Sequence, residues 1–334
     1  MRVPRHWRSS VDISPHAEAA TVAILAWFEQ LGCSAAEIER ARRFDIGGYV
    51  GIPFPTLDLQ QTTRLGKYLA LWLLWDDVDV EQLANGWRIE AADVLSDRRP
   101  SDLTRFHEGW WQLLQEFGRR RSDTWMGRLC RLMRRWSDAA AEEAALRIRY
   151  RETGELPRAA EQLELRMATI GMYGTACLIE DVVDHEAPPG FYANATIQTL
   201  QDLASRIVGL ANDLFSFAKD YQSGQLNLVS TLMRESSLSV DDALAVLVRQ
   251  HDDAVARYDE LAAKVAPWAA AGYPASERWI RELRSASLGF GVWESQAPRY
   301  MAHQVVSDGR VLRPSFRYIE PSAGLRQARQ IVVQ

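Results

Sequence analysis

The sequence predicts an all-α protein that folds as a single domain. From residue 15 to residue 290 the apolar residues recur mostly at intervals of three and four, which is the spacing of amphipathic helices, and alternating strand patterns are scarce. The chain has 334 residues, of which 47% are hydrophobic, so it can bury a sizeable core. Short breaks separate the helical stretches, and none is long enough to act as a flexible linker between two domains.

The periodic stretches give the expected helices in order along the chain. They cover residues 16–31, 35–44, 59–80, 102–117, 124–152, 157–184, 194–222, 226–234, 239–268 and 276–295. The breaks between them carry glycine and proline, as in GGYVGIPFP at 47–55 and HEAPPG at 185–190. Residues 1–14 and 301–334 lack a sustained period and are more polar, so we expect two partly ordered arms around a helical domain at 15–300.

Charge and cysteine content exclude several classes of protein. The formal net charge is −5 and is spread along the chain, so no basic surface is available for nucleic acid. Cys33, Cys130 and Cys177 are too few and too widely spaced for a disulfide framework or a zinc site, which fits a reducing compartment. The longest apolar run, at 69–75, is too short to span a bilayer. We therefore expect a cytoplasmic protein with neither a nucleic-acid partner nor a membrane span.

The first polar group follows an aromatic, apolar helix in the stretch LALWLLWDDVDVE. It places four carboxylates close together, at Asp76, Asp77, Asp79 and Glu81. These groups repel one another, and at a helix C-terminus they also oppose the helix dipole, so local stability does not explain them. A hard cation such as Mg²⁺, which takes oxygen ligands and is often shared with substrate phosphates, would explain them. A solvated acidic helix end is the alternative.

The second polar group is NDLFSFAKD, at 212–220, on a stretch with helical spacing. At about 100° per residue, Asn212, Ser216 and Asp220 share one side of the helix, with Lys219 beside them. An amide, a hydroxyl and a carboxylate oxygen one turn apart can bind one cation, and the lysine can donate to an anion held by that cation. The flanking apolar residues predict a mostly buried helix, which weighs against the alternative of an ordinary solvent-facing polar side.

A third group, Arg299 and Tyr300, follows a helix that ends near Pro298 in VWESQAPRY. Arginine makes bidentate contacts to phosphate and tyrosine adds a neutral donor, although the same pair recurs at 317–318 and is a weak signal alone. Taken together, two oxygen-rich sites with basic donors suit a substrate whose diphosphate is held by a cluster of Mg²⁺ ions. The long apolar, aromatic-rich helices would enclose the hydrocarbon part of that substrate.

With these motifs the sequence resembles the bacterial class I terpene synthases over about residues 20 to 300. Their aspartate-rich motif is matched by DDVDVE, their NSE/DTE motif by NDLFSFAKD, and their C-terminal Arg-Tyr pair by PRY, with Trp293 six residues before Arg299. The resemblance implies the isoprenoid synthase fold, a single-domain antiparallel α-helical bundle. It also implies Mg²⁺-dependent ionisation of farnesyl or geranylgeranyl diphosphate and cyclisation of the carbocation to a sesquiterpene or diterpene, with release of diphosphate.

The resemblance also assigns roles to individual residues. Three Mg²⁺ ions would be held with the help of Asp76, Asn212, Ser216 and Asp220, while Asp77 would pair with a basic residue. The diphosphate would be contacted by Arg166, Lys219, Arg299 and Tyr300. The catalytic groups would be Asp76, Asp77, Arg166, Arg299 and Tyr300. Arg166 takes the place of the family's diphosphate sensor; without the family it would be interpreted as a surface arginine on an amphipathic helix.

Aromatic faces would stabilise the carbocation through cation–π contacts in a cavity that excludes water. The aromatic side chains expected to line this cavity are those of Phe54, Trp72, Trp75, Phe215 and Trp293. A place in the ordinary core is the alternative for each of them.

Three departures from the family pattern affect these assignments. Val80 replaces the last aspartate of a full DDxxD motif, so Asp79 or Glu81 would have to stand in for it. The last NSE position is Asp220 rather than glutamate, which shortens the ligand by one methylene. The dipeptide TI at 169–170 occupies positions where many bacterial members have aspartate and glycine after the sensor.

Two other functions remain open on the sequence. A chain-elongating prenyltransferase of the same fold would need a second aspartate-rich motif, for which EDVVD at 180–184 is the candidate, yet we expect that cluster to be a solvated helix end. A non-catalytic helical binding or scaffold protein would carry the acidic groups as solvated faces. The sequence also leaves open the substrate chain length, the product and a homodimer, and the 301–334 arm is a candidate active-site lid.

Overall fold

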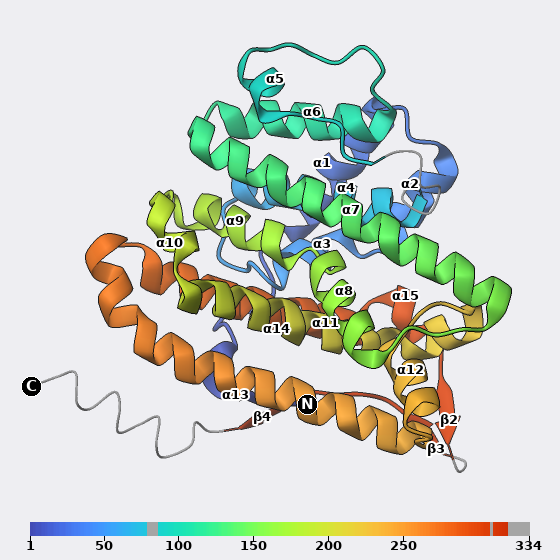
Figure 1. Ribbon diagram of the computed structural model, residues 1–334. Coiled ribbons are helices and arrows are strands. Elements are labelled where there is room, and N and C mark those ends of the chain that lie inside the picture. Colours follow the sequence, from blue (N-terminus) through green and yellow to red (C-terminus); the bar gives the residue numbers. More distant parts are fainter. Residues whose placement is uncertain (79–85, 308–309, 320–334) are drawn as a thin grey trace, which may run out of the picture.

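The computed structural model describes residues 1–78, 86–307 and 310–319, and helices make up most of them (Figure 1). The helices are α1 (Ala17–Gln30), α2 (Ala35–Arg43), α3 (Ile46–Gly51), α4 (Leu59–Val78), α5 (Ala91–Leu95), α6 (Arg105–Gly118), α7 (Asp123–Thr153), α8 (Ala159–Thr169), α9 (Met172–Val183), α10 (Pro189–Ala193), α11 (Ala195–Ser223), α12 (Leu228–Glu235), α13 (Val240–Gly272), α14 (Ser276–Gln296) and α15 (Pro298–Met301). A 3-10 turn covers Arg5–Trp7, and the short strands are β1 (Arg2–Pro4), β2 (Val305–Ser307), β3 (Arg310–Leu312) and β4 (Arg317–Ile319). The all-α class predicted from the sequence is confirmed.

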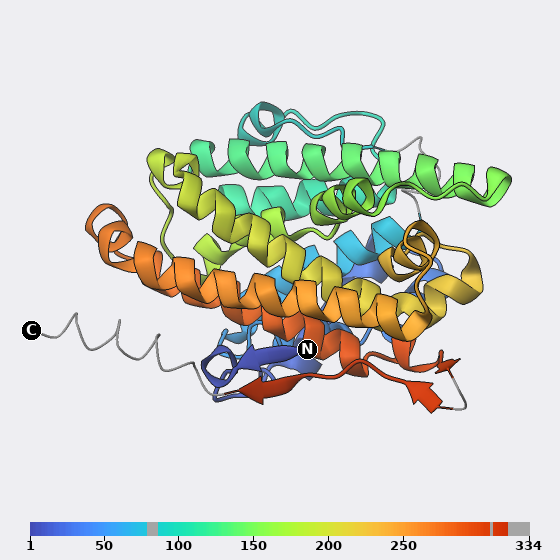
Figure 2. The ribbon, with the colours of Figure 1, turned by 60° about the horizontal axis from the view of Figure 1, so that its bottom comes forward.

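The long helices form a bundle in which α11 is the central element. It packs against α8, α9, α13 and α14, and α7 covers α8 and α9 (Figures 1 and 2). Local sequence sets both ends of α11. The Asn194 side chain accepts hydrogen bonds from the backbone amides of Thr196 and Ile197, and Gly224 ends the helix in the left-handed conformation, with φ at 64°.

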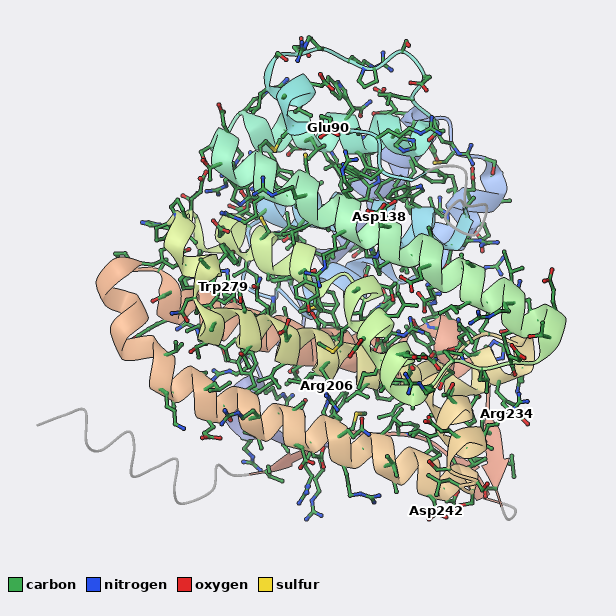
Figure 3. The ribbon with its side chains drawn as sticks, viewed as in Figure 1. Glu90, Asp138, Arg206, Arg234, Asp242 and Trp279 are labelled. Atoms are coloured by element: carbon green, nitrogen blue, oxygen red, sulfur yellow. The ribbon has the colours of Figure 1, made fainter. Side chains whose placement is uncertain are left out.

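Large side chains fill the junctions between these helices. Trp279, labelled in Figure 3, lies where α14 meets α9, and its Nε1 donates to the Ala176 carbonyl at 3.0 Å. Within the described part of the chain, no helix combines the length and the apolar character that a membrane crossing requires.

The prediction of one helix over 157–184 is wrong, because the structure has two helices there. α8 ends at Thr169 and α9 begins at Met172, with Gly171 between them at a φ of 81°. A Cβ atom at this glycine would lie 3.1 Å from Cζ2 of Trp72, so both the backbone conformation and the space favour glycine. The apolar spacing continues through the break, and for that reason the periodicity does not reveal it.

Short helices that the sequence does not predict are α3, α5, α10 and α15, four in the described part of the chain. α3 lies within the first Gly-rich break and begins after Asp45, whose side chain accepts a hydrogen bond from the Gly48 amide at 3.2 Å. α5 and α10 each have five residues. Helices of one or two turns are too short to show a hydrophobic period, which explains why the sequence pattern does not indicate them.

The two arms are packed against the bundle and against each other. β1 pairs in parallel with β4, so that Arg2 lies opposite Arg317, and Figure 2 shows the two strands side by side. β2 and β3 pair in antiparallel orientation. Trp7 is buried and its Nε1 donates to Asp259 Oδ1 of α13 at 2.7 Å. The N-terminal arm therefore contributes to the core.

The EDVVD cluster at the end of α9 is not a solvated helix end, so that expectation was wrong. Asp181 is 5% exposed and accepts hydrogen bonds from both Arg64, with Nη2 at 2.6 Å, and Arg121, with Nη2 at 2.8 Å. Glu180 is fully buried and accepts from Arg128 and from the Tyr192 hydroxyl. Arginine side chains from α4 and from the segments before and within α7 thus neutralise this cluster.

We expect the double variant Asp181→Asn/Asp184→Asn to lose stability because Asp181 compensates two buried arginines. Removing one partner of a buried ion pair costs about 3–5 kcal/mol, and urea unfolding would measure the loss. The single variant Asp184→Asn is the control, since that side chain is 73% exposed and an exposed pair contributes at most about 1 kcal/mol. Equal stability of the two variants would contradict the assignment.

Candidate active site

A cavity of about 360 Å³ brings together the polar groups that the sequence singles out. Asp76 and Asp77 near the end of α4, the polar side of α11, and Arg299 and Tyr300 of α15 all line it. Arg166 of α8 reaches the same cavity. The bundle therefore joins three motifs that are far apart in the sequence.

The polar stripe of α11 consists of Asn212, Ser216 and Asp220, and all three line the cavity. Ser216 and Asp220 are almost fully buried, and the Ser216 hydroxyl donates to Asp220 Oδ2. Asn227 Nδ2 donates to the same oxygen at 3.0 Å, and Lys219 Nζ lies 2.9 Å from Asp220 Oδ1. These donors hold the Asp220 carboxylate in a fixed orientation.

The side-chain nitrogen of Asn212 donates hydrogen bonds to two other residues of the protein. Nδ2 donates to Glu294 Oε1 at 2.8 Å and to the Tyr300 hydroxyl oxygen at 3.2 Å. Burial raises the pKa of Glu294 to about 8. Among the described residues, no hydrogen-bond partner is found for Asn212 Oδ1, which leaves this oxygen available to a cation in the cavity.

The two described aspartates of the acidic motif have different surroundings. Burial raises the pKa of Asp76 to about 7, and the carboxylates of Asp77 and Glu143 add to the increase. Asp77 instead has a cationic partner, since its Oδ1 lies 3.2 Å from Arg299 Nη2. The Arg40 guanidinium also donates to the Asp77 carbonyl at 3.2 Å. Asp76 is thus the carboxylate that a bound cation would stabilise most.

Arg166 is not a surface residue. Its side chain is 15% exposed and forms ion pairs with Asp213 of α11, at 3.0 Å, and with Glu143 of α7, at 3.1 Å. Burial alone would lower the pKa of Arg166, but the two carboxylates outweigh burial and raise it. This arginine therefore stays charged at the wall of the cavity and connects α7, α8 and α11.

Arg299 has one free hydrogen-bonding edge. Nη2 faces Asp77, and the guanidinium lies over the ring of Phe44, 5.2 Å from its centroid. Nη1 is buried without a hydrogen-bond partner among the residues that the structure describes. A buried unpaired donor is costly, and an anionic group in the cavity would satisfy it.

The donor set of the cavity fits Mg²⁺. An amide, a hydroxyl and two carboxylates supply the oxygen ligands that a hard cation prefers, from Asn212, Ser216, Asp220 and Asp76. No group of three or more His, Cys, Asp or Glu side chains is close enough to hold a metal within the described ranges. The site differs from such a cluster because Asn212 and Ser216 take the place of carboxylates.

Three of the five aromatic side chains that the sequence placed in the cavity do not line it, so those three predictions were wrong. Trp72 and Trp293 line it. Phe54 is buried against Phe290, at 6.2 Å between ring centroids, and does not reach the cavity. Phe215 points to a separate small pocket and packs on Phe316 at 5.7 Å.

The third correction is Trp75, which is fully buried in an aromatic cluster. Its neighbours are Trp87, Trp110, Trp136 and His107, with ring centroids between 5.2 and 6.3 Å away. The three residue steps from Trp72 to Trp75 turn the helix by about 300°, so the two side chains project about 60° apart, which is enough to put one at the cavity and the other in the aromatic cluster. Tyr49, Tyr68 and Phe290 line the cavity instead, together with Trp72 and Trp293.

Sequence reasoning missed several residues of the site. Asp213 had a signal, because it follows Asn212 within the motif and lies about 20° from Asp220 around the helix, but no role was assigned to it from the sequence. Glu143, Arg147, Asn227 and Glu294 lie outside all three motifs and are brought in by packing alone. Asp79 and Glu81, named as substitutes in the acidic motif, lie outside the described residues.

Comparison with known proteins agrees with this arrangement. The family model "Terpene synthase family 2, C-terminal metal binding" matches residues 67–257. The (+)-T-muurolol synthase of Roseiflexus castenholzii is 25% identical over 301 residues, covering 86% of this chain and 90% of the relative. The 7-epi-alpha-eudesmol synthase of Streptomyces viridochromogenes is 26% identical over 260 residues, covering 74% of each chain. Both are named as cyclising (2E,6E)-farnesyl diphosphate.

Solved structures share the fold. The linalool/nerolidol synthase from Streptomyces clavuligerus superimposes with a TM-score of 0.73 at 19% identity, covering 86% of this chain and 98% of that one. The 2-methylisoborneol synthase from Streptomyces coelicolor, solved with Mg²⁺ and 2-fluoroneryl diphosphate, gives a TM-score of 0.74 at 19% identity, with 91% and 98% coverage.

Trp72 and Trp75 provide a matched pair of variants. We expect Trp72→Leu to change the product distribution, because this side chain lines the cavity. Trp75→Leu should keep the distribution but lose stability on the order of 3 kcal/mol, since it opens space in the aromatic cluster. Gas chromatography of the products and urea unfolding would measure the two effects. A product shift in Trp75→Leu as large as that in Trp72→Leu would overturn the placement of these rings.

Proposed function

Because the chain belongs to the terpene synthase family, as a class I terpene cyclase, we propose that it ionises farnesyl diphosphate and cyclises the carbocation to a sesquiterpene, releasing diphosphate. The observation that carries the proposal is the meeting of three polar motifs at one cavity that also has an aromatic and apolar wall. The farnesyl chain length is supported by the two relatives named above, which cyclise that substrate. A cavity of about 360 Å³ lies near the lower end of the range of roughly 300–1,000 Å³ for ligand sites, which also favours a shorter chain over a C20 chain.

The metal-binding residues in this proposal are Asp76 on one side of the cavity and the polar stripe of α11 on the other. Mg²⁺, which we propose binds as three ions, would neutralise charge that develops on the leaving diphosphate. The protein holds the ligands ready for this task. Asp220 is oriented by Asn227 and Lys219, and Asn212 presents its Oδ1 because its Nδ2 is already bonded.

The donors for the diphosphate surround the same region. Arg299 has a buried Nη1 without a partner, and Arg166 remains charged between two carboxylates. Tyr300 accepts from Asn212, so its own proton is free to be donated. Lys219 is the fourth donor, with a side chain that is 30% exposed. These groups would bind the diphosphate and orient the chain towards the apolar wall.

The apolar wall would protect the carbocation from water. Trp72 and Trp293 present aromatic rings to the cavity, and Tyr68 and Phe290 extend the aromatic surface. Aromatic faces attract a cation through their quadrupoles and carry no lone pair as nucleophilic as water. Cyclisation in this enclosure needs no nucleophile from the protein.

The surrounding elements take supporting roles in the proposal. Residues 15–300 would form the catalytic domain. The C-terminal arm starts next to Tyr300, although its described residues line a separate small pocket and not the main cavity, so a role as a lid stays a prediction. We also propose a cytoplasmic location, and the homodimer stays a prediction.

Chain elongation is disfavoured by the position of its required motif. The EDVVD carboxylates are engaged by Arg64, Arg121 and Arg128, and none of them lines the cavity. A non-catalytic scaffold is disfavoured by family membership.

We expect Asn212→Ala and Ser216→Ala each to lower turnover of farnesyl diphosphate by at least about tenfold, because each removes one oxygen ligand from a metal site. Diphosphate release and mass spectrometry of the hydrocarbon products measure the effect, with geranylgeranyl diphosphate as the competing substrate. Thr199→Ala, also on α11 but at an exposed position outside the cavity, is the matched control. Near wild-type turnover by either variant at limiting Mg²⁺ would sink the assignment of the α11 stripe.

A further inference from the structure

Glu294 is a buried carboxyl to which none of the three motifs assigns a role. It lies on α14, directly after Trp293, and is 3% exposed. Its Oε1 accepts the 2.8 Å hydrogen bond from Asn212 Nδ2, whereas Oε2 is buried without a hydrogen-bond partner among the described residues. Burying a carboxyl with one unsatisfied oxygen is costly, and an apolar side chain of similar size would be cheaper at this position. Stability therefore does not explain the residue.

The contact with Asn212 gives Glu294 a specific task. A side-chain amide can present either its oxygen or its nitrogen to a neighbour, and the two orientations differ by a half turn about one bond. Glu294 Oε1 accepts the hydrogen bond from Nδ2, and this contact favours the orientation in which the amide nitrogen faces Glu294. The Asn212 oxygen is then the atom left for the cavity, where a cation requires an oxygen ligand.

The same amide group also reaches Tyr300. Nδ2 donates its second proton to the tyrosine hydroxyl oxygen at 3.2 Å, and Tyr300 lines the cavity. Because that oxygen already accepts a hydrogen bond from Asn212, the O–H of Tyr300 is directed away from the amide and can donate to another group. One carboxyl group thus orients a metal-ligand oxygen and a phosphate donor together.

We propose that Glu294 is a positioning residue that fixes the amide orientation of Asn212, and through it the direction of the Tyr300 hydroxyl, for binding of Mg²⁺ and diphosphate. The inference rests on the proposed function, since it assigns Asn212 to the metal site. Glu294 itself acts only through Asn212.

The test compares Glu294→Leu, Glu294→Met and Glu294→Gln. The two apolar variants remove the acceptor while filling the space, and the glutamine restores an acceptor oxygen of the same reach. Glu282→Leu is the matched control, because Glu282 is a mostly buried acid on the same helix that does not line the cavity. Binding of Mg²⁺ with inorganic diphosphate is measured by the shift in melting temperature and by calorimetry, and turnover of farnesyl diphosphate is measured in parallel.

We expect the apolar variants to need about 10- to 100-fold more Mg²⁺ for half-maximal binding, the loss typical of residues that orient a metal ligand. Their melting temperatures without ligand should stay close to that of the wild type, because Asn212 Nδ2 keeps Tyr300 as a partner. Glu294→Gln should bind like the wild type, as should Glu282→Leu. This separation of binding from stability is what a purely structural role would not produce.

Two results would overturn the inference: wild-type Mg²⁺ affinity in both apolar variants, or a loss in Glu294→Gln as large as theirs. If one apolar variant fails to fold, the other and the glutamine variant still decide the outcome. Failure of the wild-type protein itself to bind Mg²⁺ with diphosphate would contradict the proposed function instead, so the two failures are distinguishable.

Discussion

The ion pairs of Arg166 with Asp213 and Glu143 are the interaction on which the rest of the site depends. They join α7, α8 and α11 at the wall of the cavity, where one buried cation is shared between two carboxylates. Breaking a buried pair leaves an uncompensated charge, so these three helices are held in a fixed relative position. The α11 stripe and the acidic end of α4 line the cavity together with Arg166 and Glu143.

The site combines excess negative charge with low solvent access. Burial raises the pKa of Asp76 and of Asp213, and the carboxylates of Asp77 and Glu143 raise the pKa of Asp76 further. Arg147 and Arg299 offset part of the charge around Asp76, but no cationic side chain among the described residues lies within ion-pair distance of its carboxylate. Such a site is organised before its ligands arrive, which is the condition under which electrostatic stabilisation of a leaving group is most effective.

The acidic cluster of α9 and the polar stripe of α11 differ in how their charge is compensated. At the end of α9, Asp181 receives four hydrogen bonds from two arginines, so its oxygens have little capacity left for a metal ion. In the cavity, a hydrogen bond from Asn227 orients the Asp220 carboxylate. Asn212 uses its amide nitrogen for hydrogen bonding, which leaves its side-chain oxygen available. Similar sequence patterns therefore have different chemistry because of the side chains that packing places around them.

The sequence by itself determined the helical class, the approximate positions of the long helices and the residues of the three motifs, because a 3.6-residue period and a cluster of unlike polar groups are local properties. The tertiary structure decided the break at Gly171, since the side chain that lies close to this glycine is Trp72 of another helix, α4. It also decided which aromatic rings line the cavity and which fill the core, as Trp72 and Trp75 show. Glu143 and Glu294 join the site only through contacts between helices, and a contact between distant segments leaves no period or motif in one sequence.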